Sequence, residues 1–546
     1  MSNLLSKASI ILTPTAYSEG TLHSVKPLQT LGSELVTNGG FDTDSNWVKG
    51  TGWTISGGTA NQDGSNGILR QTNVVSTNTK VKVTFDLTNY GGSGNLQVKF
   101  APSIHTITLI GNGSYTVFTD GTNSVNGDLQ IITQSGFVGS IDNVSVKEVI
   151  DADFDFTRST TGSATGIGTR ENSSGNIESV AADLARIDYL GGTAHILLEP
   201  QSTNVTTNSE QPATWHSNNN VAITTNATTS PEGTTNSSLV VVDGSSGAVH
   251  TRNLCSFSSG SGTQTVTASC FLKYYNHQFV ALRSTFFTGS PAQGERSFFD
   301  IQNGVLGTVS TNHTAKIEDY GNGWYRCSIT FDIDKDQDDN GYMQVEPMSG
   351  DNTSTYASIG QGFYCFGSQG EELSFMTSYI PTSGSAVTRS ADVCNNSGSS
   401  DLINSTEGVL YAEINALANY NLQRMISVSG GNNQNIVKVG LDNSSSNFKI
   451  KSEIRSGDSS QAFMTYDFGA VTPTMTKIAV KYKENDFALW VNGVERATDT
   501  SGNAPIGLNE LSFTRGGAVH LFEGKVKCVA VFKEALTDAQ LTSLTT

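Results

Sequence analysis

Apolar and polar residues alternate along many short runs of this chain, and this pattern constrains the fold more than any other feature. The first group of runs comprises residues 81–88, 96–100, 105–110, 115–119, 129–133 and 141–149, and Gly and Asn separate several of them. A period of two residues places one face of each strand in a core and the other in solvent. We therefore predict an antiparallel β-sandwich over residues 34–150.

Two further groups of runs follow. The second, within residues 206–395, comprises 266–275, 279–284, 297–302, 304–309 and 324–333. The third, within residues 396–546, begins at 408–417 and includes the hairpin 477–495. In the third group Asn492-Gly493 predicts a type I′ turn, and Thr537 with Gln540 predicts a capping box at a terminal helix. The predicted fold class is all-β, with three antiparallel β-sandwich (jelly-roll) domains in series.

Length and composition agree with this fold class. A chain of 546 residues has room for about three domains of 100–200 residues each. Charged residues make up only 15% of it, against about 25% in an average globular protein. The abundant Gly, Ser, Thr and Asn are residues that close turns between strands.

The net charge and the lengths of the apolar runs argue against nucleic-acid binding and membrane insertion. The formal charge is −18 and Lys and Arg do not cluster, so no nucleic-acid partner is expected. An acidic chain fits neutral glycans better than anionic ones. The N-terminal apolar run is shorter than a secretory h-region of about 7–15 residues, and the sequence has no run of about 20 for a membrane helix. No membrane insertion is expected.

The six cysteines contain no CxxC pair, and none precedes Cys255. Their density is too low for a disulfide scaffold, so they are predicted to be small buried residues. Assembly in a reducing cytoplasm is compatible with this composition.

The first 33 residues contain one strand-like run, SIILT, which Pro14 and Pro27 keep short. A single strand cannot bury itself, so it is expected to pair with a partner protein or with a domain of its own chain, such as the first sandwich. The segment KASIILTPTAYSEGTLHSVKP resembles the openings of bacteriophage structural proteins. This resemblance implies an N-terminal segment, residues 1–33, that docks to virion proteins.

Residues 34–150 carry a second resemblance. They open ELVTNGGFDTDSNWVKGTGWTISGGTANQ and close GFVGSIDNVSVKEV. Both ends resemble the carbohydrate-binding β-sandwich modules of phage fibres and of surface glycan hydrolases.

Later segments resemble phage proteins or lectins. Residues 151–205 resemble an ordered connector of phage tail and virion-surface proteins, in which Arg158 and Arg186 are expected to be structural ion-pair partners. TTSPEGTTNSSLVVV (228–242) and SYIPTSGSAVTRSADVC (378–394) resemble the start and the end of the jelly roll that follows in the same proteins. The hairpin and FEGKVKCVAVFKEALTDAQLTSL (522–544) resemble the laminin-G-like, or concanavalin-A-like, lectin and glucanase fold.

Together these resemblances imply a bacteriophage virion-surface protein, either a tail fibre or a capsid fibre or decoration protein, that binds host-cell glycans. The family implies a homotrimer, assembled in the host cytoplasm and located on the virion surface. A purely structural virion protein without sugar binding and a glycan hydrolase are the alternatives.

Sugar-binding residues are predicted in the first domain, because an aromatic ring stacks on the apolar face of a pyranose. Trp47 and Trp53 are the candidate rings, and Asn89 and Tyr90 in a following loop are candidate helpers. Burial of either tryptophan in the sandwich core is the alternative. Trp324 and Trp490 are favoured as core residues.

A structural calcium ion is the predicted cofactor. In modules of this kind calcium often bridges the first and last strands, and Glu34, Asn38 and Asp142 occupy the matching ends here. A hydrogen-bonded Asp142 without metal is the alternative.

No catalytic motif is evident. The eight histidines are scattered, and no G-x-S-x-G, HExxH or P-loop sequence occurs. A pair of carboxylates assembled from distant strands would escape a sequence search, yet the chain is predicted not to be an enzyme.

Overall fold

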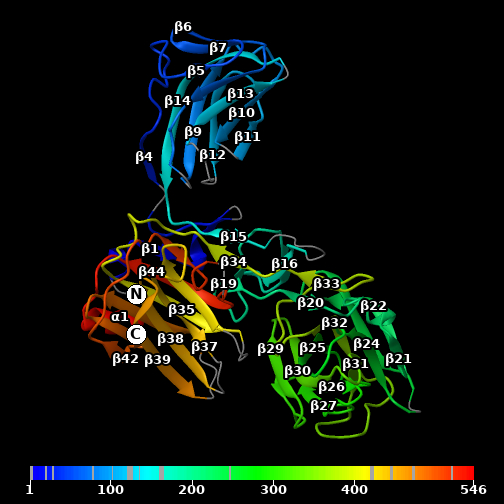
Figure 1. Ribbon diagram of the computed structural model, residues 1–546. Coiled ribbons are helices and arrows are strands. Elements are labelled where there is room, and N and C mark those ends of the chain that lie inside the picture. The colour runs from blue at the N-terminus through cyan, green and yellow to red at the C-terminus, as the bar shows by residue number, and fades with distance from the viewer. Residues whose placement is uncertain are drawn as a thin grey trace. The chain divides into compact units, whose positions relative to one another are not determined.

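The computed structural model describes residues 4–18, 21–27, 30–76, 79–100, 103–119, 127–134, 136–158, 165–244, 247–417, 423–442, 447–469, 474–517 and 520–546 (Figure 1). In these residues strands dominate, and a single α-helix, α1 (Asp538–Thr545), is present. The chain divides into two compact units, Lys26–Ala152 and the remainder. The predicted all-β fold class is confirmed.

The first sandwich lies within Lys26–Ala152 and has two antiparallel sheets. One sheet has the order β11 (Ser103–Ile107), β10 (Asn95–Phe100), β13 (Leu129–Gln134), β8 (Gly67–Gln71), β5 (Val48–Lys49). The other has the order β12 (Gly113–Thr119), β9 (Val81–Thr88), β14 (Val138–Ile150), β7 (Thr59–Asp63), β6 (Trp53–Ser56), and β4 (Thr30–Glu34) also pairs with β14. The buried alternate residues of β9 and β10 meet in one core, as the period-2 pattern predicts.

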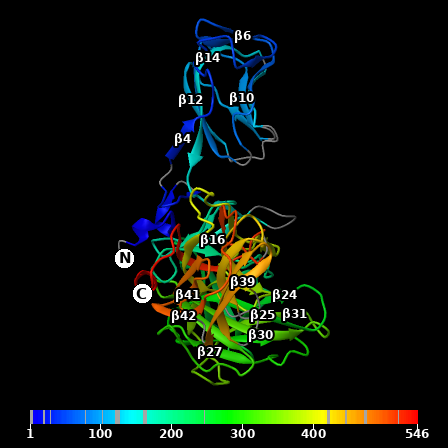
Figure 2. The same ribbon diagram turned by 60° about the vertical axis from the view of Figure 1, so that its left-hand side comes forward.

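The second sandwich has two six-stranded antiparallel sheets (Figures 1 and 2). The first has the order β21 (Ser217–Asn219), β24 (His250–Ser256), β31 (Asn340–Pro347), β26 (Phe279–Thr285), β27 (Arg296–Asp300), β28 (Val305–Leu306). The second has the order β22 (Val221–Thr229), β23 (Thr235–Val242), β32 (Gly362–Glu371), β25 (Thr263–Tyr274), β30 (Trp324–Asp334), β29 (Thr314–Asp319). Cys255 and Val345 of the first sheet share a core with Val266 and Ile329 of the second.

The third sandwich pairs an eight-stranded with a five-stranded sheet. The larger has the order β18 (Ile187–Asp188), β19 (His195–Leu198), β44 (Gly524–Phe532), β35 (Glu407–Ala416), β40 (Thr476–Lys483), β41 (Phe487–Val491), β42 (Val494–Asp499), and β1 (Ile10–Leu12) also pairs with β44. The smaller has the order β39 (Ser459–Gly469), β38 (Phe448–Ser456), β37 (Ile436–Asp442), β36 (Gln423–Ser429), β43 (Glu510–Ser512). Asn492 and Gly493 have φ of 48° and 80°, and Thr537 with Gln540 forms the capping box of α1, so both local predictions are confirmed.

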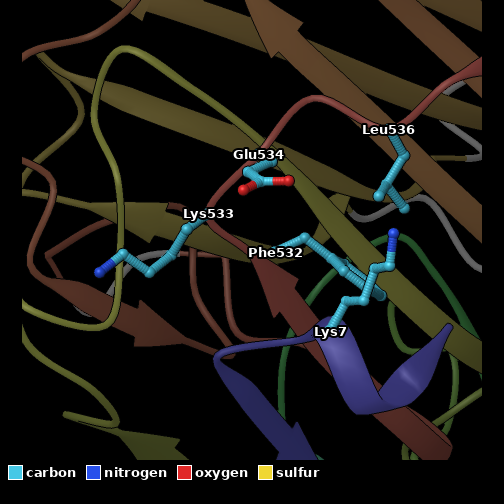
Figure 3. Close-up of a pocket in the computed structure, with 5 residues that line it drawn as sticks. All are labelled: Lys7, Phe532, Lys533, Glu534 and Leu536. Atoms are coloured by element: carbon cyan, nitrogen blue, oxygen red, sulfur yellow. The ribbon is translucent and has the colours of Figure 1, made fainter.

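The strand predicted near the N-terminus pairs with the third sandwich and not with the first. Ile10 lies opposite Val531 of β44, and all three residues of β1 are buried. The outer face of this sheet is apolar, and Ala8, Ile11 and α1 cover it. Figure 3 shows Lys7 of the 3-10 helix η1 (Leu5–Lys7) beside Phe532 and Leu536, where they line a surface pocket of about 540 Å³. The edge of β44 therefore supplies the backbone pairing that β1 needs. The local sequence around β1 did not indicate this partner.

Short elements connect the sandwiches. Those in the leader are η2 (Pro14–Ala16) and the pair β2 (Tyr17–Ser18) with β3 (Thr21–Leu22). The rest are β15 (Asp155–Thr157) with β34 (Val393–Asn395), β16 (Gly168–Glu171) with β17 (Ile177–Val180), β20 (Ser202–Asn204) with β33 (Val387–Arg389), and η3 (Pro212–Thr214). The predicted connector thus pairs with the segment that closes the second sandwich, and through β18 and β19 with the third.

A buried ion network fixes this connector. Arg158 pairs with Asp392 at 2.9 Å, and Arg186 pairs with Glu199 at 2.7 Å and also with Asp392. Burial alone would raise the pKa of Glu199, but the guanidinium groups of Arg186 and Arg389 and hydrogen bonds from Ser378 lower it to about 2. The expectation that Arg158 and Arg186 are structural ion-pair partners is confirmed.

All six cysteines are free and buried, as expected. Among the described residues, no helix is long and apolar enough to cross a membrane.

Candidate functional site

The two tryptophans predicted to stack on sugar lie in the core of the first sandwich. Trp47 is 6% exposed and Trp53 is 4% exposed. The Trp47 ring packs against Phe41 with 5.2 Å between ring centroids, and its Nε1 donates to the Asn38 carbonyl at 3.0 Å. Neither ring has a face open to solvent, so burial corrects the stacking hypothesis and agrees with the core alternative.

The two helper residues are also engaged within the first sandwich. The Asn89 Nδ2 donates to the Ser140 hydroxyl at 3.1 Å. Tyr90 packs against Phe137, with 5.9 Å between ring centroids. The four predicted sugar-binding residues therefore do not assemble into an exposed aromatic platform.

The three residues of the predicted calcium site have separate roles. Glu34 lies opposite Lys147 on β14, five residues or about 16 Å along the strand from Asp142. Its Oε1 accepts the Val146 N–H at 2.8 Å and its Oε2 accepts the Ser145 hydroxyl at 2.6 Å. Burial would raise the Glu34 pKa, but these hydrogen bonds lower it.

The other two predicted ligands serve local turns. The Asn38 side chain donates to the carbonyls of Thr43 and Ser45, and Asp142 accepts the Asn143 N–H at 2.6 Å. No cluster of three or more His, Cys, Asp or Glu that could hold a metal occurs in the described residues. The calcium ion stays a prediction that the register of β4 and β14 does not support.

A different face carries the chemistry expected of a sugar site. In the first sheet of the second sandwich, residues that alternate with the core residues point away from the core. Arg252 of β24 lies opposite Gln344 of β31, Gln344 lies opposite Arg283 of β26, and Arg283 lies opposite Arg296 of β27. Figure 1 shows these strands side by side. Because directly opposite residues share a face at about 4.5–5.5 Å, the four side chains form one row across the sheet.

We call this surface the aromatic–arginine face and define it by the outward residues of these strands and the ring that follows β26. Its members are His250, Arg252, Arg283, Phe286, Arg296, Tyr342, Gln344 and Glu346.

Glu346 anchors two of the three arginines. It is 0% exposed and pairs with Arg296, whose Nη2 lies 3.2 Å from Oε1. The Arg283 Nη1 lies 3.6 Å from the same oxygen, and the Gln344 amide donates to it at 2.6 Å. A buried carboxylate with several donors holds the arginine side chains in fixed positions.

Aromatic rings lie at one end of the row. Phe286 is 54% exposed, and its ring meets that of Tyr342 edge-on, with 5.6 Å between centroids. The Arg252 guanidinium lies over both rings, 5.2 Å from the Phe286 centroid and 4.6 Å from that of Tyr342. The exposed ring of His216 lies 4.5 Å from Tyr342.

The backbone of Phe286 is strained. Its φ is 66°, in the left-handed region that bulky residues rarely adopt. The next residue, Phe287, is buried in the core of the sandwich, so the turn that sends Phe287 inward holds Phe286 outward. Strain of this kind costs about 1–3 kcal/mol and collects at functional sites.

His250 adds an unsatisfied polar group to the aromatic–arginine face. It is 6% exposed, and neither ring nitrogen has a hydrogen-bond partner within the described part of the chain. Burial and the neighbouring Arg252 lower its pKa, while Glu346 opposes them. The face thus offers exposed rings beside several hydrogen-bond donors, which is the combination that binds a polyhydroxylated ligand.

The sequence contains a signal for this face that its strand pattern alone does not locate. Polar and aromatic residues occupy alternate positions in H-x-R (250–252) and in Y-x-Q-x-E (342–346). These residues lie on the opposite face of each strand from the core residues. Only the pairing register of the strands shows that they lie next to one another.

A second polar pocket, of about 280 Å³, has Asp188, Glu318 and Lys316 in its lining. Its charged groups are already paired, since Asp188 lies 2.9 Å from His195 and Lys316 lies 2.5 Å from Glu318. The pocket therefore has less capacity for a ligand than the aromatic–arginine face.

Comparison with known proteins finds a family similarity for part of the chain. Residues 399–542 match the concanavalin A-like lectin/glucanases superfamily, which confirms the resemblance seen for the third sandwich. No curated protein matches the chain.

Two kinds of solved structure are similar to this chain. One is the CBM40 of a Ruminococcus gnavus IT-sialidase, bound to α2,3 sialyllactose, with 18% identity over 28% of this chain and 94% of that one, and a TM-score of 0.23. The other is the N-terminal CBM22-1–CBM22-2 tandem domain of Paenibacillus barcinonensis Xyn10C, with 12% identity over 64% of this chain and 100% of that one, and a TM-score of 0.21. TM-scores this low carry no argument about function.

Proposed function

We propose that this chain is a non-catalytic glycan-binding protein, and that its sugar site is the aromatic–arginine face of the second sandwich. The observation that carries the proposal is the row Arg252–Gln344–Arg283–Arg296 next to the exposed ring of Phe286 and the half-buried ring of Tyr342. The match of residues 399–542 to a superfamily that includes lectins supports the same class of function.

The chemistry of the face suits a sugar. A pyranose ring can stack on Phe286 while its hydroxyls meet guanidinium donors of the row. Such single sites are weak, but linked copies raise the apparent affinity by about 10²–10⁴-fold. A homotrimer, as the phage resemblance implies, would supply that multiplicity.

We further propose that the protein is displayed on a bacteriophage particle, as a tail fibre or as a capsid fibre or decoration protein, and adheres to host-cell glycans. The leader and the connector at residues 151–205 support this setting through their resemblance to phage proteins. Buried, unpaired cysteines are compatible with assembly in the host cytoplasm. Incorporation of the tagged chain into particles tests this setting independently of sugar binding.

A glycan array with the full-length protein tests the proposed site. Phe286→Ala and Tyr342→Ala should each weaken binding by about tenfold, because a contact with an aromatic ring is worth on the order of 1 kcal/mol. Phe118→Ala is the matched control, since Phe118 is 51% exposed on the first sandwich. Equal binding by all three variants would contradict the site, and sugar release from the array would contradict a non-catalytic role.

A further inference from the structure

Arg252 differs from the other two arginines of the aromatic–arginine face. Glu346 holds Arg283 and Arg296, whereas Arg252 has no hydrogen-bond or ion-pair partner in the described part of the chain. Its guanidinium lies over the rings of Phe286 and Tyr342. A guanidinium stacked on a ring keeps its in-plane N–H groups available, and their fork matches the oxygens of a carboxylate or sulfate.

The local charge of this face is opposite to that of the whole chain. Two of the three arginines pair with Glu346 and, among the described residues, Arg252 pairs with no carboxylate, although the formal charge of the protein is −18. The acidic loop that precedes β31 ends at Asp339, and Arg252 lies opposite Gln344, about 16 Å farther along the strand. Charges at that distance are largely screened, because the Debye length is about 8 Å at physiological ionic strength.

His250 adds an unpartnered, uncharged hydrogen-bonding group beside Arg252. It lies on the same outward face of β24 as Arg252, two residues away, and both of its ring nitrogens lack a hydrogen-bond partner among the described residues. A buried polar side chain without a partner is costly unless a ligand or water satisfies it.

We propose that the glycan bound at the aromatic–arginine face is anionic, and that its carboxylate or sulfate group binds Arg252. This inference rests on the proposed function and names its ligand class as a uronic, sialic or sulfated sugar. It reverses the expectation from composition that neutral glycans fit better, because screening leaves the local charge and not the net charge to act on a ligand.

Calorimetry on the full-length protein tests the proposal with three probes of related backbone: polygalacturonate, its carboxyl-reduced neutral galactan and a sulfated galactan. We expect polygalacturonate or the sulfated galactan to bind at least about tenfold more tightly than the neutral polymer, since hydrogen bonds to a charged group are worth about 1.5–3 kcal/mol. Comparison of the two anionic probes shows which group Arg252 prefers. Binding of the preferred probe should weaken as salt is raised.

Variants of Arg252 separate a specific contact from general charge. Arg252→Gln should abolish the preference for the anionic probe, and Arg252→Lys should restore only part of it, because lysine lacks the planar fork. Arg496→Gln is the matched control, since Arg496 also lies over a ring, 4.2 Å from the Tyr466 centroid in the third sandwich. Thermal unfolding of each variant verifies that it is folded.

The outcomes distinguish this inference from the function on which it rests. Equal binding of neutral and anionic polymers would overturn the anionic ligand and leave glycan binding in place. Equal losses in Arg252→Gln and Arg496→Gln would also overturn it, since general charge would then explain the preference. Failure of every probe to bind would count against both the inference and the proposed function.

Discussion

The first and second sandwiches have the same architecture but place their aromatic residues differently. Each has a row of polar residues across the outer face of one sheet. In the first sandwich Arg70 lies opposite Gln130, and Gln130 lies opposite Lys99. In the described residues this row has no ring beside it, because Trp47 and Trp53 are in the core. In the second sandwich the comparable row adjoins Phe286 and Tyr342.

A count of aromatic residues therefore does not locate a sugar site. What matters is which face of a strand carries each ring. Arg70 also has an acidic neighbour, Asp128, at 3.7 Å, whereas Arg252 has none within the described residues. This contrast is why we propose the site on the second sandwich.

The largest expected effect is a loss of stability in the first sandwich without a loss of glycan binding. Trp47→Ala removes a buried ring from the first sandwich and should lower its free energy of unfolding by about 3–5 kcal/mol. Glycan binding by the second sandwich should persist under conditions in which the variant is folded. Urea unfolding followed by fluorescence, combined with the glycan array, measures both. Loss of binding at unchanged stability would return the site to the first sandwich.

A second prediction concerns the buried ion network of the larger unit, which contrasts with the exposed pair Lys49–Asp44 of the first sandwich. Asp392→Asn leaves Arg158 and Arg186 without their shared carboxylate. We expect it to lower the free energy of unfolding of the larger unit by about 3–5 kcal/mol.

Asp44→Asn is the control for that variant. Its exposed pair with Lys49 should contribute less than about 1 kcal/mol. Calorimetric unfolding compares the two variants, and equal effects would refute the structural role of the network.

The two units should also differ in their response to pH. Burial, with help from nearby carboxylates, raises the pKa of Glu171, Glu210 and Glu523 to about 7 in the larger unit. A raised folded-state pKa means that stability is fully present below the unfolded value near 4.5 and is lost as pH rises through about 7. Burial lowers the pKa of His313 to about 4, and this acts in the opposite direction, so the larger unit should lose only on the order of 1–2 kcal/mol between pH 5 and pH 8.

In the described part of the first sandwich, the shifted carboxyl pKa values are all lowered, as for Glu34 and Asp86. Their contribution is present above the unfolded pKa and is lost only as pH falls, so this unit should change little between pH 5 and pH 8. Thermal unfolding at the two pH values measures both units. Glu523→Gln should reduce the change in stability with pH of the larger unit. An unchanged pH dependence would mean that other groups cause it.

The smallest expected effect concerns the strain at Phe286. Phe286→Gly should stabilise the second sandwich by up to about 1 kcal/mol, because glycine adopts positive φ without steric cost. Phe118→Gly, in the extended backbone of β12, should destabilise the first sandwich by about the same amount. Denaturant midpoints test this opposite sign, and destabilisation by both variants would show that Phe286 is not strained.

Much of the fold was predictable from sequence because a buried strand face repeats every two residues. Residues 81–88 match β9 for this reason. The pairing of β1 with β44 was not predictable, since its partners lie at opposite ends of the chain and no local pattern connects them.

The candidate site was less predictable than the fold. Trp53 lies on the same face of β6 as buried Ile55. The strand pattern therefore indicated a core position for Trp53 and argued against sugar stacking. Trp47 lies outside any strand, where alternation gives no guidance. The row of Arg252, Gln344 and Arg283 comes from three separate strands, and its existence depends on register.

Hydrogen–deuterium exchange of the full-length protein, with and without the tightest glycan from the array, tests the location of the site most directly. Glycan bound at the aromatic–arginine face should slow exchange in residues 250–256, 279–286 and 340–347 and leave residues 67–71 and 95–100 unchanged. Slower exchange confined to the first sandwich would contradict it.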